Sequence, residues 1–187
     1  MFFPTHNRIS TRSGTVNADF NALESAKKFA TQKAAALAVV TEKHFYCGEP
    51  SMLTGVAHLV DLPIIRWDFI VDSYQLMQSK LWGADAIRII VPLLDQIELT
   101  ELHKKALELD LEVIWEIHSA DDVQRISAFE QHGILYLESE TLELEQAESI
   151  VKNLPFAAPA LFNGDCFSDA DVPEKLFAGK ISFKNAQ

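Results

Sequence analysis

The stretch AIRIIVPLLDQIELTELHKKALELDLEVIWEIH, residues 86–118, contains two apolar runs that flank an amphipathic pattern. The runs Ala86–Leu94 and Glu112–His118 are short and rich in branched and aromatic side chains, which is typical of buried strands. Between them, apolar residues recur every three or four positions within Gln96–Leu109, opposite charged side chains, which predicts a helix. A strand, a helix and a second strand in this order predict two parallel strands joined by a crossover helix.

The same alternation continues along the chain on both sides of this unit. Strands are expected at Met1–His6, Ala35–Thr41, Leu62–Phe69, Ala86–Leu94, Glu112–His118, Gly133–Ser139, Pro159–Gly164 and Lys180–Asn185. Helices are expected at Ala18–Gln32, Ser51–Val60, Ser73–Trp82, Gln96–Leu109, Ala120–Gln131, Leu142–Leu154 and Asp169–Phe177. Such an α/β alternation forms either a doubly wound sheet or a closed barrel, and eight strands favour a (β/α)8 TIM barrel.

The chain is short for such a barrel. A (β/α)8 barrel typically has about 250 residues, whereas this chain has 187. We therefore expect one domain over residues 1–187, a minimal barrel that lacks an N-terminal extension and the final helix. Without an eighth helix, apolar barrel wall would be exposed between the first and seventh helices, and such patches usually mark interfaces. This predicts a homo-oligomer or a partner protein at that seam.

Composition and charge exclude several function classes. With 16 lysines and arginines against 27 aspartates and glutamates, the formal charge is −11, which disfavours binding to nucleic-acid phosphates. The apolar runs are shorter than the roughly 18–20 residues that span a membrane, and no secretory signal core is found at the start of the chain. Cys47 and Cys166 do not suggest a disulfide framework. We expect a cytoplasmic protein without a nucleic-acid or membrane partner.

Five stretches in chain order resemble the indole-3-glycerol phosphate synthase family. They are Ser10–Gly14 (STRSG), Val40–Gly48 (VTEKHFYCG), Leu62–Gln75 (LPIIRWDFIVDSYQ), Gly83–Val91 (GADAIRIIV) and Glu112–His118 (EVIWEIH). The resemblance implies a (β/α)8 barrel and a cofactor-free carbon–carbon lyase of tryptophan biosynthesis. Members of that family close an indole ring on a carboxyphenylamino-deoxyribulose phosphate, with loss of carbon dioxide and water. This chemistry needs a general acid, a general base and a phosphate clamp at the carboxyl ends of the strands.

The resemblance places the family's catalytic roles on three positions of this chain. Glu116 keeps the family's acidic residue, and we expect it either to act in the site or to be a buried, paired carboxylate of the barrel mouth. Trp67 and Asn7 stand where the family has lysines. An indole N–H donates a hydrogen bond but has no proton to transfer near neutral pH, and Asn7 is not ionisable either. Both positions are therefore expected to be inactive.

The resemblance also marks candidate ligand-binding positions. Ser10 keeps a serine of the family's first loop. Phe45 and Tyr46 belong to the segment after the second strand that resembles the family. Glu138 stands where the family has an asparagine after the sixth strand. Asn163 and Gly164 occupy the end of the seventh strand, where backbone N–H groups bind anions.

Acidic residues occupy several places where the family needs positive charge. Glu138 and Glu140 replace an asparagine and an arginine, and Asp165 follows Gly164, so these acids would repel a phosphate. Together with Glu116, His44 and His118 they would hold a divalent metal or a cationic ligand, or they would form a solvated acidic rim. No recognised zinc or nucleotide-binding spacing occurs, and we predict no resident metal or cofactor.

Three functional hypotheses remain open at this stage. The first is a divergent, catalytically degenerate member of the indole-3-glycerol phosphate synthase family. The second is a non-catalytic pseudoenzyme that binds a small aromatic or phosphorylated molecule or acts in regulation. The third is an enzyme with new chemistry, built around Glu116 and the acidic barrel mouth. In each case the predicted partner is a small molecule.

Overall fold

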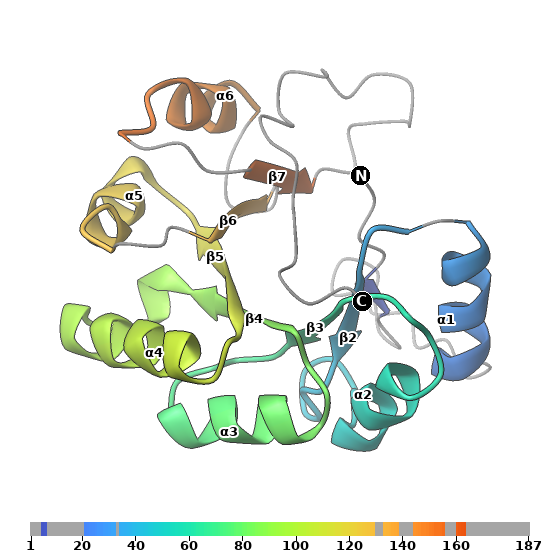
Figure 1. Cartoon of the computed structure of the whole chain (residues 1–187). Coiled ribbons are helices and arrows are strands. Elements are labelled where there is room, and N and C mark those ends of the chain that lie inside the picture. The colour runs from blue at the N-terminus through green and yellow to red at the C-terminus, as the bar shows by residue number, and fades with distance from the viewer. Residues whose placement is uncertain are drawn as a thin grey trace.

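The computed structural model describes residues 5–6, 21–32, 34–129, 133–138, 144–155 and 160–163. Within them, seven parallel strands form one sheet in the order β1-β2-β3-β4-β5-β6-β7, and Figure 1 shows the helices on the outside of the arc of strands. The strands are β1 (Thr5–His6), β2 (Leu37–Val40), β3 (Ile64–Trp67), β4 (Ala86–Ile90), β5 (Glu112–Ile117), β6 (Ile134–Glu138) and β7 (Ala160–Asn163). The helices are α1 (Ala22–Thr31), α2 (Pro50–Ala57), α3 (Ser73–Leu81), α4 (Gln96–Glu108), α5 (Ala120–Ile126) and α6 (Leu144–Lys152).

Strands β2 to β5 are buried on both faces, so they contribute to two separate apolar clusters. On β2, Leu37 and Val39 pack with helix residues, whereas Ala38 and Val40 pack only with residues of the other strands and their loops. This alternation follows from the two-residue period of a strand. The inner cluster consists of Ala36, Ala38, Val40, Ile65, Trp67, Ala86, Ile114, Ile134 and Tyr136, with Tyr46 packed against it.

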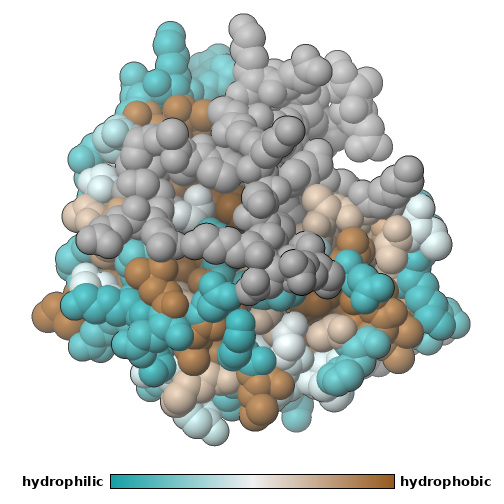
Figure 2. Space-filling model, viewed as in Figure 1, coloured by the Kyte–Doolittle hydropathy of each residue, from teal (hydrophilic) through white to brown (hydrophobic). Residues whose placement is uncertain are grey.

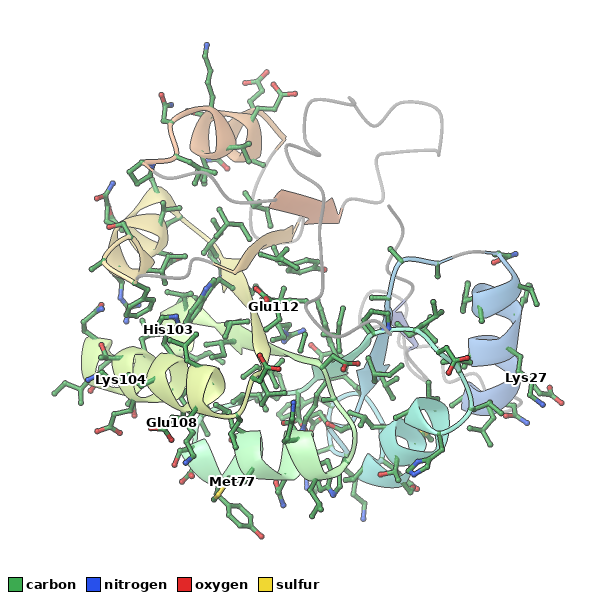
Figure 3. The ribbon with its side chains drawn as sticks, viewed as in Figure 1. Lys27, Met77, His103, Lys104, Glu108 and Glu112 are labelled. Carbon is green, nitrogen blue, oxygen red and sulfur yellow. The ribbon has the colours of Figure 1, made fainter. Side chains whose placement is uncertain are left out.

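The helices present their apolar sides to the sheet, as their sequence patterns predict. On α4, Leu99, Leu102 and Ala106 are buried against the strands. Figure 3 shows Lys104 and Glu108 on the outer side of the same helix. In the view of Figure 2, hydrophobic residues reach the described surface in several separate places among hydrophilic ones. No helix among the described residues is long and apolar enough to cross a membrane.

The polar residues that begin these helices explain why they start where they do. Asp95 accepts backbone N–H bonds from Ile97 and Glu98, while the Glu98 side chain accepts from the Asp95 N–H, so the two residues form a capping box at the start of α4. The Ser119 side chain caps α5, which begins at Ala120 as the sequence predicts. The first helix, by contrast, begins at Ala22 rather than at Ala18, because the Asn21 side chain caps it.

The fourth strand is shorter than the sequence predicts. The fourth strand ends at Ile90 rather than Leu94, because Pro92 has no N–H for the ladder and the chain turns into a 3-10 helix, η1 (Val91–Leu93). The Arg125 guanidinium donates to the carbonyls of Val91 and Leu94 and holds this turn.

The fifth helix ends at Ile126 rather than Gln131, because the chain turns there to bury an aromatic ring. Phe129 stacks on His103 of α4 with ring centroids 4.5 Å apart, and it also contacts Trp115 of β5. The predicted last strand and last helix, and with them the seam predicted beside a missing eighth helix, lie outside the described residues. The interface at that seam stays a prediction.

Candidate functional site

Four inward-facing side chains from neighbouring strands meet inside the sheet near the carboxyl ends of β3, β5 and β6. They are Trp67 of β3, Arg88 of β4, Glu116 of β5 and Tyr136 of β6, and all four are buried. Strand alternation places them here: Arg88 pairs in register with Ile114, and Glu116 pairs with Tyr136. Barrel enzymes build their sites at this end of the strands.

Both carboxylate oxygens of Glu116 are engaged by neighbouring groups. Its Oε2 lies 3.2 Å from the Nε of Arg88, and its Oε1 lies 2.9 Å from the Nε2 of His118, which is partly exposed. The Arg88 contact is an ion pair without a well-directed hydrogen bond, because the Nε–H of Arg88 has no acceptor in line. Glu116 is thus buried and paired, and its role in the site stays a prediction.

Trp67 fills the end of β3 with a packed indole ring. The guanidinium carbon of Arg88 lies 4.4 Å from the centroid of this ring, and the Tyr136 ring meets it edge-on at 4.9 Å. A cation over an indole face is attracted by the ring electrons. Position 67 therefore carries no ionisable group, and a positive charge from the next strand lies against it.

An aromatic loop after β2 extends this cluster outward. Phe45 and Tyr46 lie 5.8 and 5.9 Å from the Phe69 ring by centroid, and the guanidinium carbon of Arg88 lies 5.9 Å from the same ring. Phe45 is 69% exposed, whereas Tyr46 packs against the inner cluster. The loop and the residue after β3 thus form an aromatic side of the site.

Glu42 holds this loop in shape. Its carboxylate accepts the backbone N–H groups of His44, Phe45 and Tyr46 at 2.6–3.0 Å. Burial raises the pKa of Glu42, but the three backbone hydrogen bonds together outweigh it and leave the pKa below its usual value. The chain then returns close to β2 at Gly48, where a Cβ atom would lie 2.3 Å from the Val40 carbonyl oxygen. Only glycine fits that approach.

A second buried arginine, Arg66 of β3, supports the site from the opposite face of the sheet. Its guanidinium donates to Thr41, to the Asp68 carboxylate, and to the Gln75 carbonyl and Ser79 hydroxyl of α3. It also stacks over the Trp82 ring at 4.5 Å. This network ties the ends of β2 and β3 to α3, so the Arg-Trp-Asp-Phe segment contributes support as well as site residues.

Some predicted site residues are not brought into this cluster or are not described. Asn7, Ser10 and Gly164 lie outside the described residues, as do Glu140 and Asp165. Glu138 and Asn163 pair in register at the ends of β6 and β7, and their backbone alone is described. His44 is exposed on its loop. Among the described residues, no group of three or more His, Cys, Asp or Glu side chains could hold a metal ion.

Arg88, like Tyr136, is a member of the cluster that the sequence analysis missed. A signal was present, because Arg88 interrupts the apolar run of β4 and shares the strand parity of Ala86 and Ile90. An arginine in the interior of a buried parallel strand needs a charged partner. Glu116, the acid at the end of the next strand, is that partner.

The chain was compared with known families and structures. The sequence model of the family "Indole-3-glycerol phosphate synthase" matches residues 6–150. Indole-3-glycerol phosphate synthase of Aliarcobacter butzleri is 40% identical over 118 residues, which cover 63% of this chain and 45% of the relative. The Priestia megaterium enzyme of the same name is 32% identical over 153 residues, 79% of this chain and 60% of the relative.

The solved structures agree with the barrel. A mutant tryptophan synthase alpha-subunit from the hyperthermophile Pyrococcus furiosus superposes with a TM-score of 0.55 over 75% of this chain and 72% of that one, at 11% identity. This likeness concerns the fold alone, and the chain spans about half the length of the curated relatives it matches. The family match nevertheless covers most of the chain, which therefore belongs to the indole-3-glycerol phosphate synthase family and has an α/β TIM-barrel fold.

Proposed function

We propose that this member of a tryptophan-biosynthesis family does not close the indole ring and that its barrel mouth binds a small ligand instead. One observation carries the proposal. Trp67, which occupies the place of a family lysine by resemblance, is a buried indole packed between Arg88 and Tyr136. An indole cannot deliver a proton to a substrate near neutral pH.

The contacts of Glu116 support the same proposal. A substrate that needed this carboxylate would have to compete with Arg88 for Oε2 and with His118 for Oε1. General acid–base help is worth about 10²–10⁴-fold in rate, so the loss of one proton-transfer group is enough to suppress turnover severely. The retained acid is here a member of an internal charge network.

The aromatic side of the cluster favours a binding role. Phe45, Tyr46, Phe69 and Trp67 line or approach the same end of the sheet as the Arg88–Glu116 pair. Small-molecule sites commonly combine aromatic walls with a few polar groups that fix orientation. A ligand with an unsaturated ring and a charged group fits that description.

A second candidate function is favoured by the hydrogen bond between Glu116 and His118. An imidazole held by a carboxylate at 2.9 Å is an arrangement that proton-transfer enzymes use, and the His118 side chain is 30% exposed. This pair would carry new chemistry at the barrel mouth. A pH–rate profile that followed His118, and vanished in His118→Asn, would favour this candidate over the binding role.

The proposed function is tested by a direct assay of indole-glycerol phosphate formation from the family substrate, with the Priestia megaterium relative as the positive control. We expect no turnover by the unmodified protein and measurable binding of the substrate by calorimetry. Turnover at a rate near that of the relative would refute the proposal. Absence of both turnover and binding would refute the binding role.

A companion variant tests whether position 67 is the missing group. A lysine at position 67 would lie beside the guanidinium of Arg88, so Trp67→Lys is combined with Arg88→Met to remove the like charge. The control combines Arg88→Met with Tyr74→Lys, which adds a lysine on an exposed position of α3. Turnover gained by the first pair and not by the second would identify position 67 as the defect.

A further inference from the structure

The guanidinium of Arg88 is buried and poorly hydrogen-bonded. The Arg88 side chain is 5% exposed, and the buried Nε–H has no hydrogen-bond acceptor. A buried charged group without directed hydrogen bonds is costly, and structures that keep one usually supply a counter-charge. Glu116 supplies the counter-charge at 3.2 Å, but its carboxylate is not in line with the Nε–H of Arg88 and does not accept a hydrogen bond from it.

The neighbours of Arg88 show which way its side chain extends. It contacts Glu116 near the end of β5, Trp67 at the end of β3 and Phe69 two residues beyond that end. All three lie toward the carboxyl ends of the strands, so the guanidinium is directed to the mouth of the barrel rather than to its floor. Aromatic rings face it on the β3 side, and they hold a cation without using its N–H groups.

We propose that Arg88 is an oxyanion-binding residue, which receives the carboxylate or phosphate group of a ligand at the barrel mouth. This inference rests on the proposed binding function and names the charge of its ligand. A guanidinium presents five N–H donors in a planar fork that matches two oxygens of an oxyanion. An incoming oxyanion competes with Glu116 for this fork, while the Glu116 carboxylate keeps its hydrogen bond from His118.

The experiment records the arginine Nε–H signals of the full chain by nitrogen-15 NMR during titration. The probes are acetate, benzoate and inorganic phosphate, with benzyl alcohol as an uncharged aromatic control. Arg66 is an internal reference, because it is equally buried and its Nε–H is hydrogen-bonded. We expect the Arg88 signal to shift saturably with the oxyanions and the Arg66 signal to stay in place.

The probes distinguish the two sources of an oxyanion. Stronger binding of benzoate than of acetate, by about three- to tenfold, indicates a carboxylate beside the aromatic walls. Saturation by phosphate alone indicates a phosphorylated ligand. An Arg88 signal that no oxyanion moves, or that moves together with the Arg66 signal, overturns the proposal.

Three variants test the assignment without relying on the NMR spectrum of the unmodified protein alone. Arg88→Met removes the signal and the oxyanion binding, whereas Arg125→Met removes a guanidinium that holds carbonyls of the η1 turn and leaves the binding intact. Glu116→Gln removes the internal competitor and tightens oxyanion binding by about tenfold or more, since a hydrogen bond to a charged group is the stronger kind. Unchanged or weaker binding in Glu116→Gln contradicts the proposal, even where Arg88→Met does not fold.

The two proposals can fail separately. Turnover of the family substrate by the unmodified protein would refute the non-catalytic function and leave the shift of the Arg88 signal as the test of the oxyanion site. A stationary Arg88 signal with no turnover and with calorimetric binding of the family substrate would refute the oxyanion site alone.

Discussion

Arg66 and Arg88 are two buried arginines on neighbouring parallel strands, and they do different things. Arg66 is 3% exposed and Arg88 is 4% exposed. The guanidinium of Arg66 is hydrogen-bonded to groups of β2, α3 and the segment after β3. That of Arg88 has an ion pair with Glu116 and the faces of two aromatic rings. The arginine between the sheet and the helices thus has several hydrogen-bond acceptors, whereas the Nε–H of the arginine inside the sheet has none.

The difference comes from strand alternation. Arg66 faces the helix layer, where the Gln75 carbonyl and the Ser79 hydroxyl of α3 accept its hydrogen bonds. Arg88 faces the interior, where strand backbones already use their own donors and acceptors in the ladder. Only side chains remain as partners there, and most of the inner cluster is apolar. A charged residue on that face is costly for folding and available for binding.

The largest expected effect concerns the bonded arginine. Arg66→Met should lower the free energy of unfolding by about 3–5 kcal/mol, because it removes the charged partner of the half-buried Asp68 carboxylate and the hydrogen bonds that join β3 to α3. Urea unfolding followed by circular dichroism measures this. Met77→Ala, on the outer side of α3 and 44% exposed, is the control and should change stability far less. If Arg66→Met lowered the free energy of unfolding less than Arg88→Met does, Arg88 would be the more important of the two arginines for stability, contrary to this prediction.

Arg88→Met should cost less, about 1–3 kcal/mol, because Glu116 keeps His118 as a partner. The double variant Arg88→Met with Glu116→Gln removes both charges together, and replacing both members of a buried pair is often nearly neutral. We therefore expect the double variant to recover part of the loss in the same urea experiment. Losses that simply add would mean that the two side chains do not interact in solution.

Local patterns were sufficient to predict much of this fold. Asp95 with Glu98 and Ser119 with its acidic first turn begin their helices where the sequence places them. These signals act within one helical turn, so no distant contact is needed to interpret them. Phe129 shows the limit, because its stacking on His103 joins α4 to the end of α5 and stops that helix early. Sequence periodicity has no information on such a contact.

The site was harder to predict than the fold. Resemblance marked Trp67 and Glu116, and both lie in the cluster. Arg88 was missed because its partners come from β3 and β5, and their meeting depends on the register between strands. A strand residue can be assigned to the interior only when its neighbours' register is known. Interactions between strands, rather than within them, therefore decide which charges the site contains.

The smallest expected effect on stability is that of Glu42→Gln, and it depends on pH. Three backbone N–H groups hold the pKa of Glu42, in the aromatic loop beside the Arg88 site, below its usual value of 4.5. A carboxyl whose pKa is lower in the folded state stabilises the fold above the unfolded pKa and loses that contribution as the pH falls through the folded value. Glu42→Gln should thus cost about 1 kcal/mol at neutral pH, the difference between charged and neutral hydrogen bonds.

The cost of Glu42→Gln should shrink as the pH falls from about 4.5, the ordinary pKa of the unfolded carboxyl, through the lower pKa of the folded one. Urea unfolding of both proteins across this range measures the difference, and Glu49→Gln, whose exposed side chain caps no backbone N–H of α2, is the control. A constant cost through acidic pH would mean that the charge of Glu42 does not hold the loop. In that case the packing of Phe45 and Tyr46 on Phe69 would be the stronger constraint on the aromatic side of the site.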